Sequence, residues 1–153
     1  MARTKRVLIL SDLQIPYHDE LAVKATLGFI KWYRPDELWC VGDEIDAPEP
    51  SRWNKDMKGE YEDTLQDSID WTADIMADYR KALGRNKPFY IQRSNHTDRI
   101  ETYIRKYAPA FAPLRSLKVE QLLGYSALGI DYLHRMRELL PGWVLSLIHI
   151  SEP

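Results

Sequence analysis

The sequence predicts an α/β protein in which helices flank a parallel sheet, and two observations favour this class. Three short apolar runs, at 7–10, 37–43 and 88–94, alternate with stretches in which apolar residues recur every three or four positions. A strand, a helix and a second strand follow one another within residues 7–43, and such a unit makes its two strands parallel and adjacent.

The first strand and helix lie in residues 7–33. VLIL at 7–10 is a continuous run of branched apolar residues, which is typical of a strand covered on both faces. A helix is expected over 20–33, and Pro35 ends it. Its apolar side chains recur on one face, as in an amphipathic helix: Leu21, Ala25, Phe29 and Trp32.

The second strand, ELWCVGD at 37–43, is expected to be buried and to contain a buried thiol, Cys40. The later elements are expected in this order: a helix at 61–83, a strand at 88–94, a helix at 96–108, a short helix at 118–123 and a strand near 129–133. The helix at 61–83 has an apolar stripe and a glycine as a C-cap: Leu65, Ile69, Met76, Leu83 and Gly84.

Composition limits the class of protein. The chain has 153 residues, the length of one domain, a net charge of −2 and one cysteine, so no internal disulfide framework is expected. The charge lowers the expectation of a large basic nucleic-acid surface, although a local patch is compatible with it. No apolar run approaches the ~20 residues of a membrane span. The stretch after the basic start is too short for a signal peptide, so we expect a cytoplasmic protein without membrane contact.

Polar side chains follow each of the three predicted strands: Asp12 and Gln14, then Asp43 and Asp46, then Asn95 and His96. In a parallel α/β sheet the carboxyl ends of the strands form one edge, and ligands bind there. Burying three carboxylates together is costly unless a cation compensates them. Aspartate, asparagine and histidine suit Mn, Fe, Zn or Mg, so we expect a metal centre, which is dinuclear if a central aspartate is shared.

Each of these residues has an ordinary structural explanation when it is taken alone. Asp12 could cap a helix, and the Gly42-Asp43 pair could be a common turn. Asn95 could be a helix N-cap followed by an ordinary exposed histidine. The occurrence of all three motifs at successive strand ends favours the metal centre.

The order D-x-Q, GD-x-x-D and NH resembles the motifs of the calcineurin-like metallophosphoesterase superfamily, whose first motif usually reads D-x-H. VLILSDLQIPYHDE, CVGDEID and SNHTDR are similar to its phage and bacterial members in particular. The resemblance covers residues from about 6 to 144. It implies an αββα sandwich in which this chain supplies the first sheet and its helices.

The resemblance also implies a role for each matched residue. Asp12 would bind the first of two divalent metal ions, Asp43 would bridge both, and Asn95 would bind the second. His96 would lie just outside the metal shell and would protonate the leaving oxygen or stabilise the phosphoryl charge. The two cations would hold the phosphate and activate a bridging water.

Gln14 departs from the family, which usually has a metal-binding histidine at this position. A glutamine carbonyl can bind a hard cation, but it binds zinc or iron more weakly than imidazole does. The substitution therefore favours Mn or Mg, Mn above all, or a first site that fills poorly. The alternative is that Gln14 only forms hydrogen bonds to its neighbours.

Four further residues are candidates for lesser roles. Asp46 is expected to support the site from outside the metal shell or to anchor a loop. Arg99, one helical turn after His96, could bind a substrate phosphate, although an exposed helix arginine is the commoner case. His18 could line the cleft, and Trp53 could stack on a base or cover the edge of the core.

The residues LSLIHISEP at 145–153 resemble one reading frame of the adapter used in transposon-based sequencing libraries. We therefore expect the native domain to span 1–144 and exclude the tail, with His149, from fold reasoning. The alternative is a genuine C-terminal strand. A complete family member would supply three more histidines, two of them in a GH-x-H turn that is absent here. We therefore expect the second sheet to be largely missing, an apolar face to be open and metal binding to be weak.

The sequence thus favours a phosphoesterase that hydrolyses phosphomonoesters or phosphodiesters with a metal-activated water, and that is impaired in this chain. Its substrate could be a nucleotide or a nucleic acid. One alternative is a nuclease of the same superfamily acting on DNA ends, which a basic, aromatic-lined groove would favour. Another is a non-catalytic binding module with a relict metal site, which Gln14 and the missing histidines favour.

Overall fold

The computed structural model describes residues 4–48, 50 and 65–145. They contain a four-stranded parallel sheet in which the spatial order, β1-β2-β3-β4, equals the order along the chain. The strands are β1 (Val7–Leu10), β2 (Glu37–Cys40), β3 (Phe89–Gln92) and β4 (Asp131–Leu133). The predicted α/β class is confirmed, as is the parallel pairing of the first two strands.

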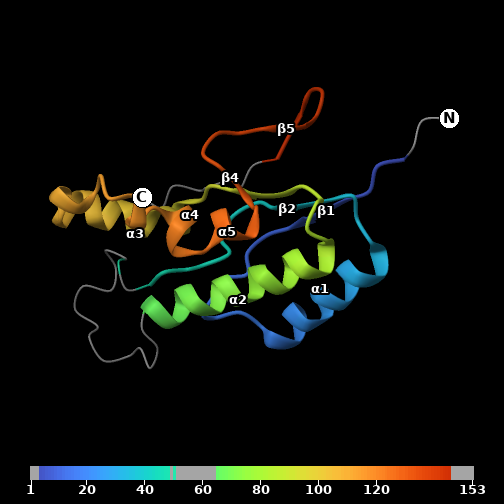
Figure 1. Cartoon of the computed structure of the whole chain (residues 1–153), viewed down its shortest axis with the longest axis horizontal. Coiled ribbons are helices and arrows are strands. Elements are labelled where there is room, and N and C mark those ends of the chain that lie inside the picture. The colour runs from blue at the N-terminus through green and yellow to red at the C-terminus, as the bar shows by residue number, and fades with distance from the viewer. Residues whose placement is uncertain (1–3, 49, 51–64, 146–153) are drawn as a thin grey trace, which may run out of the picture.

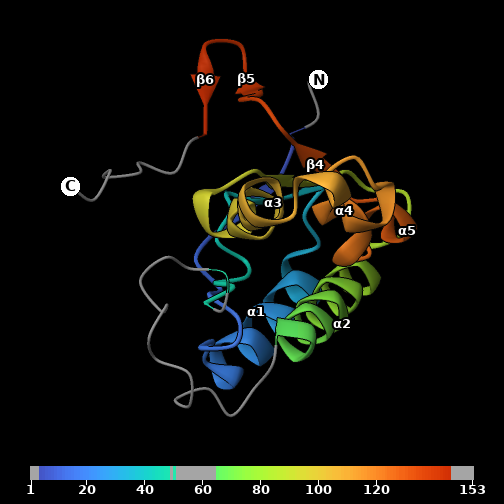
Figure 2. The same ribbon diagram turned by 90° about the vertical axis from the view of Figure 1, so that its left-hand side faces the viewer.

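Helices connect these strands: α1 (Glu20–Tyr33), α2 (Leu65–Leu83), α3 (Asn95–Tyr107), and the shorter η2 (Pro109–Phe111), η3 (Arg115–Leu117), α4 (Val119–Leu122) and α5 (Tyr125–Leu128). In Figures 1 and 2, α1 and α2 lie side by side against one face of the sheet. A hairpin of β5 (Glu138–Leu140) and β6 (Trp143–Val144) projects on the other side. None of the helices in these described residues is long and apolar enough to cross a membrane.

The hydrophobic core lies between the sheet and the layer formed by α1 and α2. Leu38, Phe89 and Ile91 belong to this core and are each at most 1% exposed, because alternate residues of a strand point to one side. Met76 of α2 is fully buried against them, and Cys40 is buried as predicted. Burying such a side chain stabilises the fold by roughly 2 kcal/mol, which fixes α2 on the sheet.

A buried arginine joins the end of α2 to the two strands that follow. Arg80 is 6% exposed and donates hydrogen bonds to the main-chain oxygens of Lys87, at 2.6 Å, and Gly129, at 2.7 Å. These carbonyls precede β3 and β4, so one side chain fixes the positions at which both strands begin.

The apolar face of α1 that the sequence suggests does not pack on the core. Leu21 and Trp32 are each 75% exposed and Phe29 is 42% exposed, whereas Ile30 is fully buried and Val23 packs against the core. Both sets of residues recur at helical spacing, so periodicity alone could not tell which face meets the sheet.

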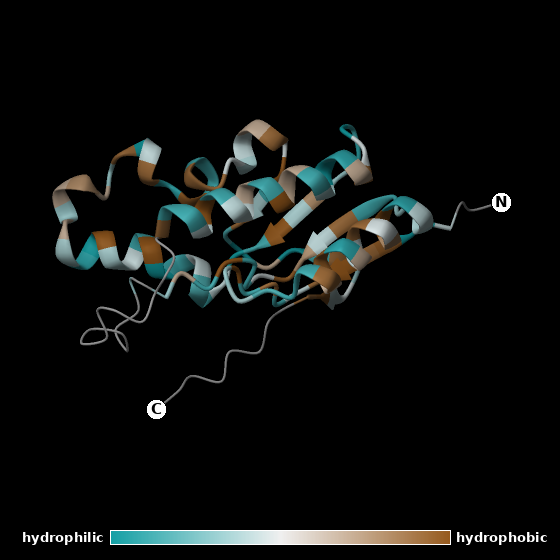
Figure 3. Cartoon of the chain, turned by 90° about the horizontal axis from the view of Figure 1, so that it is seen from below, coloured by the Kyte–Doolittle hydropathy of each residue, from teal (hydrophilic) through white to brown (hydrophobic). Residues whose placement is uncertain are grey.

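The expectation that β1 is covered on both faces is wrong for the described residues. Ile9 is 43% exposed, because the helical layer covers only the opposite side of the sheet. Trp39 and Tyr90 share this face but are buried, since their ring centroids lie 4.6 Å apart and the guanidinium of Arg137 lies 4.4 Å from the centre of the Tyr90 ring. Figure 3 shows mainly hydrophobic strands and helices that alternate between hydrophobic and hydrophilic residues.

Element boundaries differ from the expected ones mostly at strand ends. β2 ends at Cys40 and β3 at Gln92, because the chain turns after each strand into the loops described below. The helix α5 was not predicted, since a four-residue helix shows no full hydrophobic period. Residues 146–153 of the expected adapter-like tail, including His149, lie outside the described residues, as does Trp53.

Candidate metal centre

The loops that follow β1 and β2 run side by side beyond the ends of the strands. The main-chain N–H of Asp12 donates to the oxygen of Gly42 at 3.3 Å, and that of Gln14 donates to the oxygen of Asp43 at 2.9 Å. A parallel bridge between Ile15 and Ile45 follows. The first two predicted motifs are therefore brought together by main-chain pairing that continues past the strands.

Backbone strain is concentrated in these two loops. Asp12, Gln14 and Asp43 have φ values of 56°, 54° and 54°, in the left-handed region that residues other than glycine seldom adopt. Each such conformation costs on the order of 1–3 kcal/mol, and strain of this kind gathers at functional sites. Main-chain strain at three of the predicted ligand positions therefore marks this edge of the sheet as a candidate site.

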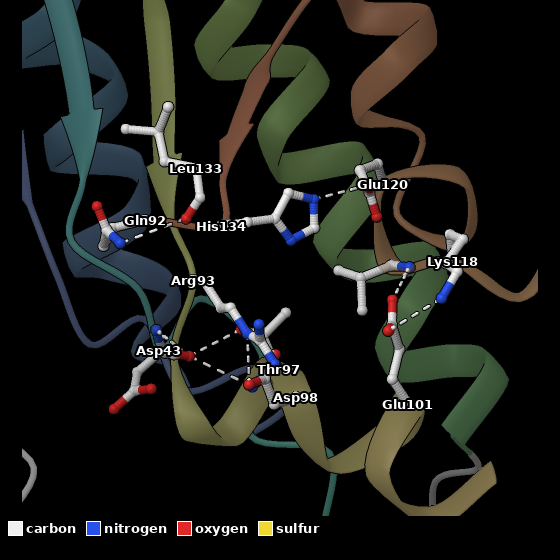
Figure 4. A network of polar contacts seen from close by, with 12 residues as sticks. Asp43, Gln92, Arg93, Thr97, Asp98, Glu101, Lys118, Glu120, Leu133 and His134 are labelled. Carbon is white, nitrogen blue, oxygen red and sulfur yellow. Dashed lines mark hydrogen bonds and ion pairs between the residues drawn. The ribbon is translucent and has the colours of Figure 1, made fainter. Parts of the chain in front are cut away.

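The N-cap residue of α3, Ser94, connects the loop of Asp43 to the motif formed by Asn95 and His96. The Asp43 main-chain N–H donates to Ser94 Oγ at 3.1 Å, and the same Oγ accepts the N–H of Thr97 as the N-cap of α3. Asn95 and His96 form the first turn of that helix. In Figure 4 the carboxylate of Asp43 points away from Thr97 and the rest of the polar network.

The side chains predicted to bind metal provide oxygen donors that other described residues do not use. Asp43 is 7% exposed, and its Oδ1 is buried with no hydrogen-bond partner among the described residues. Within the same residues, the side chains of Asp12, Gln14 and Asn95 show no hydrogen bond. An unpaired buried carboxylate oxygen is costly, and a hard cation such as Mg²⁺ or Mn²⁺ would satisfy it.

The donor set is smaller than expected for a complete centre. No group of three or more histidine, cysteine, aspartate or glutamate residues in the described part of the chain is placed to hold a metal. The expected joint burial of three carboxylates is wrong, because Asp12 is exposed and Asp46 is only half-buried, which leaves Asp43 as the buried one. Two carboxylates and two amides form an all-oxygen set, which suits hard cations better than zinc.

His96, Asp46 and Arg99 form a connected group beside these donors. Asp46 Oδ1 lies 2.5 Å from His96 Nδ1 and 3.0 Å from Arg99 Nη1. Arg99 Nη2 lies 3.3 Å from His96 Nε2. A carboxylate only accepts and a guanidinium only donates, so these contacts match the tautomer of His96 that carries a proton on Nδ1 and an acceptor lone pair on Nε2.

Glu44 is a polar residue of this region that the sequence did not single out. It is fully buried, and its Oε1 accepts from Tyr125 Oη at 2.7 Å and from Thr97 Oγ1 at 3.2 Å. Its Oε2 has no partner among the described residues, and burial raises the pKa of its carboxyl to about 7. The partners lie 53 and 81 positions away, so no local pattern could have revealed them.

Buried hydrogen bonds through Ser94 and Thr97 connect the main-chain N–H of Asp43 to the side chain of the next residue, Glu44, and so form a closed ring beside the site. Thr97 Oγ1, which donates to Glu44, also lies 2.9 Å from Ser94 Oγ, which accepts the N–H of Asp43. The loop that carries Asp43 is thus attached at two points to the first turn of α3, where Asn95 lies.

Two other histidines lie apart from this group. His18 is half-buried, with its Nδ1 unpartnered among the described residues. His134 follows β4, is exposed, and lies 3.1 Å from Glu120 Oε1 on the side of α4, as Figure 4 shows. Neither contacts the connected group of His96, Asp46 and Arg99.

The chain is similar in sequence to proteins of two mycobacteriophages. The chain is 32% identical over 143 residues to the Gene 54 protein of Mycobacterium phage L5 and 34% identical over 143 residues to the Gene 54 protein of Mycobacterium phage D29. The aligned region covers 92% of this chain but 55% of each relative, so the chain spans about half the length of the curated relatives it matches. No family model and no solved structure matches it. The chain is similar to these mycobacteriophage proteins along nearly all of its length.

Proposed function

We propose that this chain carries the metal-binding part of a calcineurin-like metallophosphoesterase that hydrolyses phosphomonoesters or phosphodiesters. The observation that carries the proposal is the meeting of Asp12, Gln14 and Asp43 at one sheet edge, with an unpaired buried oxygen on Asp43. In this proposal the four-stranded sheet is the first of the two sheets of an αββα sandwich.

The donors have distinct places in the proposed site. Asp12 and Gln14 would hold one divalent cation, Asn95 would hold a second, and Asp43 would contact both. Such cations supply the chemistry of lowering the pKa of a bound water and neutralising phosphoryl charge. The oxygen-only donor set favours Mn²⁺ or Mg²⁺.

Asp46 and Arg99 would control what His96 can do. Asp46 would fix the imidazole by accepting the Nδ1 proton, so Nε2 would be the nitrogen that acts on the substrate. In the structure, Arg99 Nη2 lies within hydrogen-bond distance of His96 Nε2. If Arg99 turned to bind a phosphoryl oxygen, Nε2 would become available to take up a proton and deliver it to the leaving oxygen.

The first experiment is a Mn²⁺ titration of the chain, together with Mn²⁺-dependent hydrolysis of p-nitrophenyl phosphate and bis-p-nitrophenyl phosphate. His96→Asn is expected to lower hydrolysis by about 10²- to 10⁴-fold while Mn²⁺ affinity is retained, since general acid catalysis supplies that factor. His134→Asn, at the exposed histidine after β4, is the matched control and should leave both unchanged. Absence of Mn²⁺ binding by the parent chain would rule out the proposal.

The ring around Glu44 makes a second prediction through two matched variants. Thr97→Val and Tyr125→Phe each delete one hydroxyl that donates to Glu44 Oε1. Thr97→Val also frees the first turn of α3, so we expect it to weaken Mn²⁺ binding by about tenfold or more. Tyr125→Phe should lose comparable stability, about 1–3 kcal/mol, and keep the Mn²⁺ affinity. Mn²⁺ affinities equal to that of the parent in both variants would show that the ring only stabilises the fold.

A non-catalytic binding module is the second candidate. Two observations favour this candidate. The contact of Arg99 with His96 Nε2 hinders proton transfer by the histidine, and the small set of metal donors limits metal-assisted hydrolysis. Mn²⁺ binding without hydrolysis of either ester would decide for this candidate.

A further inference from the structure

One face of α3 leads away from the candidate metal centre along the length of the helix. At 100° per residue, seven residues fall within about 140° of the helix circumference. They begin at the site and continue to the last turn: Asn95, His96, Arg99, Thr102, Tyr103, Lys106 and Tyr107. We call this surface the α3 track.

The outer half of the α3 track presents aromatic rings beside a cation. Tyr103 is 47% exposed and Tyr107 is 46% exposed, and their ring centroids lie 4.7 Å apart. The Nζ of Lys106 lies 5.1 Å from the centre of the Tyr107 ring. Exposed aromatic faces interleaved with basic side chains are the combination on which unpaired bases stack while their phosphates are neutralised.

The charges on the α3 track have one sign. Arg99 and Lys106 lie on it, whereas the two carboxylates of α3, Asp98 and Glu101, project from other sides of the helix. Both carboxylates are also neutralised locally. Figure 4 shows Asp98 paired with Arg93, at 2.6 Å, and Glu101 with Lys118, at 3.3 Å. Arg99 is itself paired with Asp46 Oδ1, at 3.0 Å, so the track offers a phosphate chain Lys106, and it offers Arg99 only where a phosphate takes the place of Asp46.

We propose that the α3 track binds a single-stranded nucleic acid and guides one of its phosphodiesters to His96 and Arg99. This rests on the proposed phosphoesterase function and names its substrate class. His96 and Tyr107 are separated by eleven residue steps of α3, or ~16 Å of helix axis, which is the length of about five stacked nucleotides. Stacking on tyrosines does not distinguish bases, so binding is independent of sequence.

Fluorescence anisotropy with a labelled mixed-sequence 15-nucleotide strand, as DNA and as RNA, in EDTA, tests the track without any metal. Tyr103→Ala and Tyr107→Ala are each expected to weaken binding by about tenfold or more, because a stacked base contributes that much. Lys106→Ala should reduce the slope of log affinity against log salt by about 0.7. Trp32→Ala, at a 75% exposed aromatic residue of α1, and Lys31→Ala are the matched controls and should bind like the parent.

Loss of binding in both tyrosine variants, with either DNA or RNA, supports the proposal, and the tighter strand identifies the sugar of the substrate. Absence of oligonucleotide binding by the parent, or unchanged binding by the tyrosine variants, overturns it, as would be the case if the track bound a protein. Hydrolysis of bis-p-nitrophenyl phosphate separates the two proposals. Hydrolysis without strand binding rejects only the α3 track. Strand binding without Mn²⁺ binding rejects the phosphoesterase and the guiding of a phosphodiester to His96, and leaves the α3 track as a binding surface alone.

Discussion

Glu44→Gln is expected to stabilise the metal-free protein at pH 8 by about 3 kcal/mol and to have little effect at pH 4. Burial raises the pKa of the Glu44 carboxyl from 4.5 to about 7, despite two hydrogen bonds that favour the charged form. Glutamine keeps an acceptor oxygen for Thr97 and Tyr125 and carries no charge, so it mimics the protonated carboxyl.

The sign follows from proton uptake. Between pH 4.5 and about 7 the folded protein holds a proton on Glu44 that the unfolded chain has lost. The free energy of unfolding therefore falls as the pH rises through this window and levels off above it. The glutamine variant has no carboxyl to titrate at this position. The difference in free energy of unfolding between the variant and the parent should therefore grow from below about 1 kcal/mol at pH 5 to about 3 kcal/mol at pH 8.

Urea unfolding in EDTA at pH 4, 5, 6, 7 and 8 measures this difference between variant and parent. Glu138→Gln, at an exposed glutamate of β5, removes the same charge without burial and should show no such trend. A stability difference that does not change with pH would mean that Glu44 titrates alike in the folded and unfolded chains.

Asp43→Asn is expected to lower Mn²⁺ affinity by more than about 100-fold and to abolish Mn²⁺-dependent hydrolysis, while metal-free stability does not fall. Loss of a residue that only supports a ligand already costs 10- to 100-fold in affinity, and Asp43 is proposed to contact both cations. Its buried Oδ1 has no partner among the described residues, so removing the charge relieves a cost in the metal-free protein.

Calorimetric Mn²⁺ titration and urea unfolding in EDTA give the two readouts. Asp78→Asn, at an exposed aspartate of α2, controls for the change in net charge and should alter neither. Unchanged Mn²⁺ affinity in the Asp43 variant would contradict the assignment of this residue as the central ligand.

Local pattern predicted the secondary structure better than it predicted burial. The bounds of α1 and β1 agree with the expected ranges. The carboxylate of Asp19 caps the first turn of α1 by accepting the N–H of Leu21, Pro35 follows the end of the helix, and Asp12 closely follows the strand. Which face of α1 packs inward could not be predicted, since it depends on how the helix is rotated on a sheet that forms from distant residues.

The candidate site was predictable as far as strand order determines it. Parallel strands bring Asp12, Gln14 and Asp43 to one edge whatever the details of packing. The ring that includes Glu44 depends on Tyr125, from a four-residue helix without a sequence signal. The contact of Arg99 with both His96 and Asp46 depends on how α3 is docked, which spacing along the helix does not fix.

The equality of spatial and sequential strand order has a consequence for synthesis. As the chain leaves the ribosome, each strand from β2 to β4 finds its hydrogen-bonding neighbour already made, because the neighbour is always the preceding strand. No strand has to be inserted between two earlier ones. The sheet can therefore grow in one direction at the pace of translation, and the loops of the candidate metal centre are assembled in the same order as their codons.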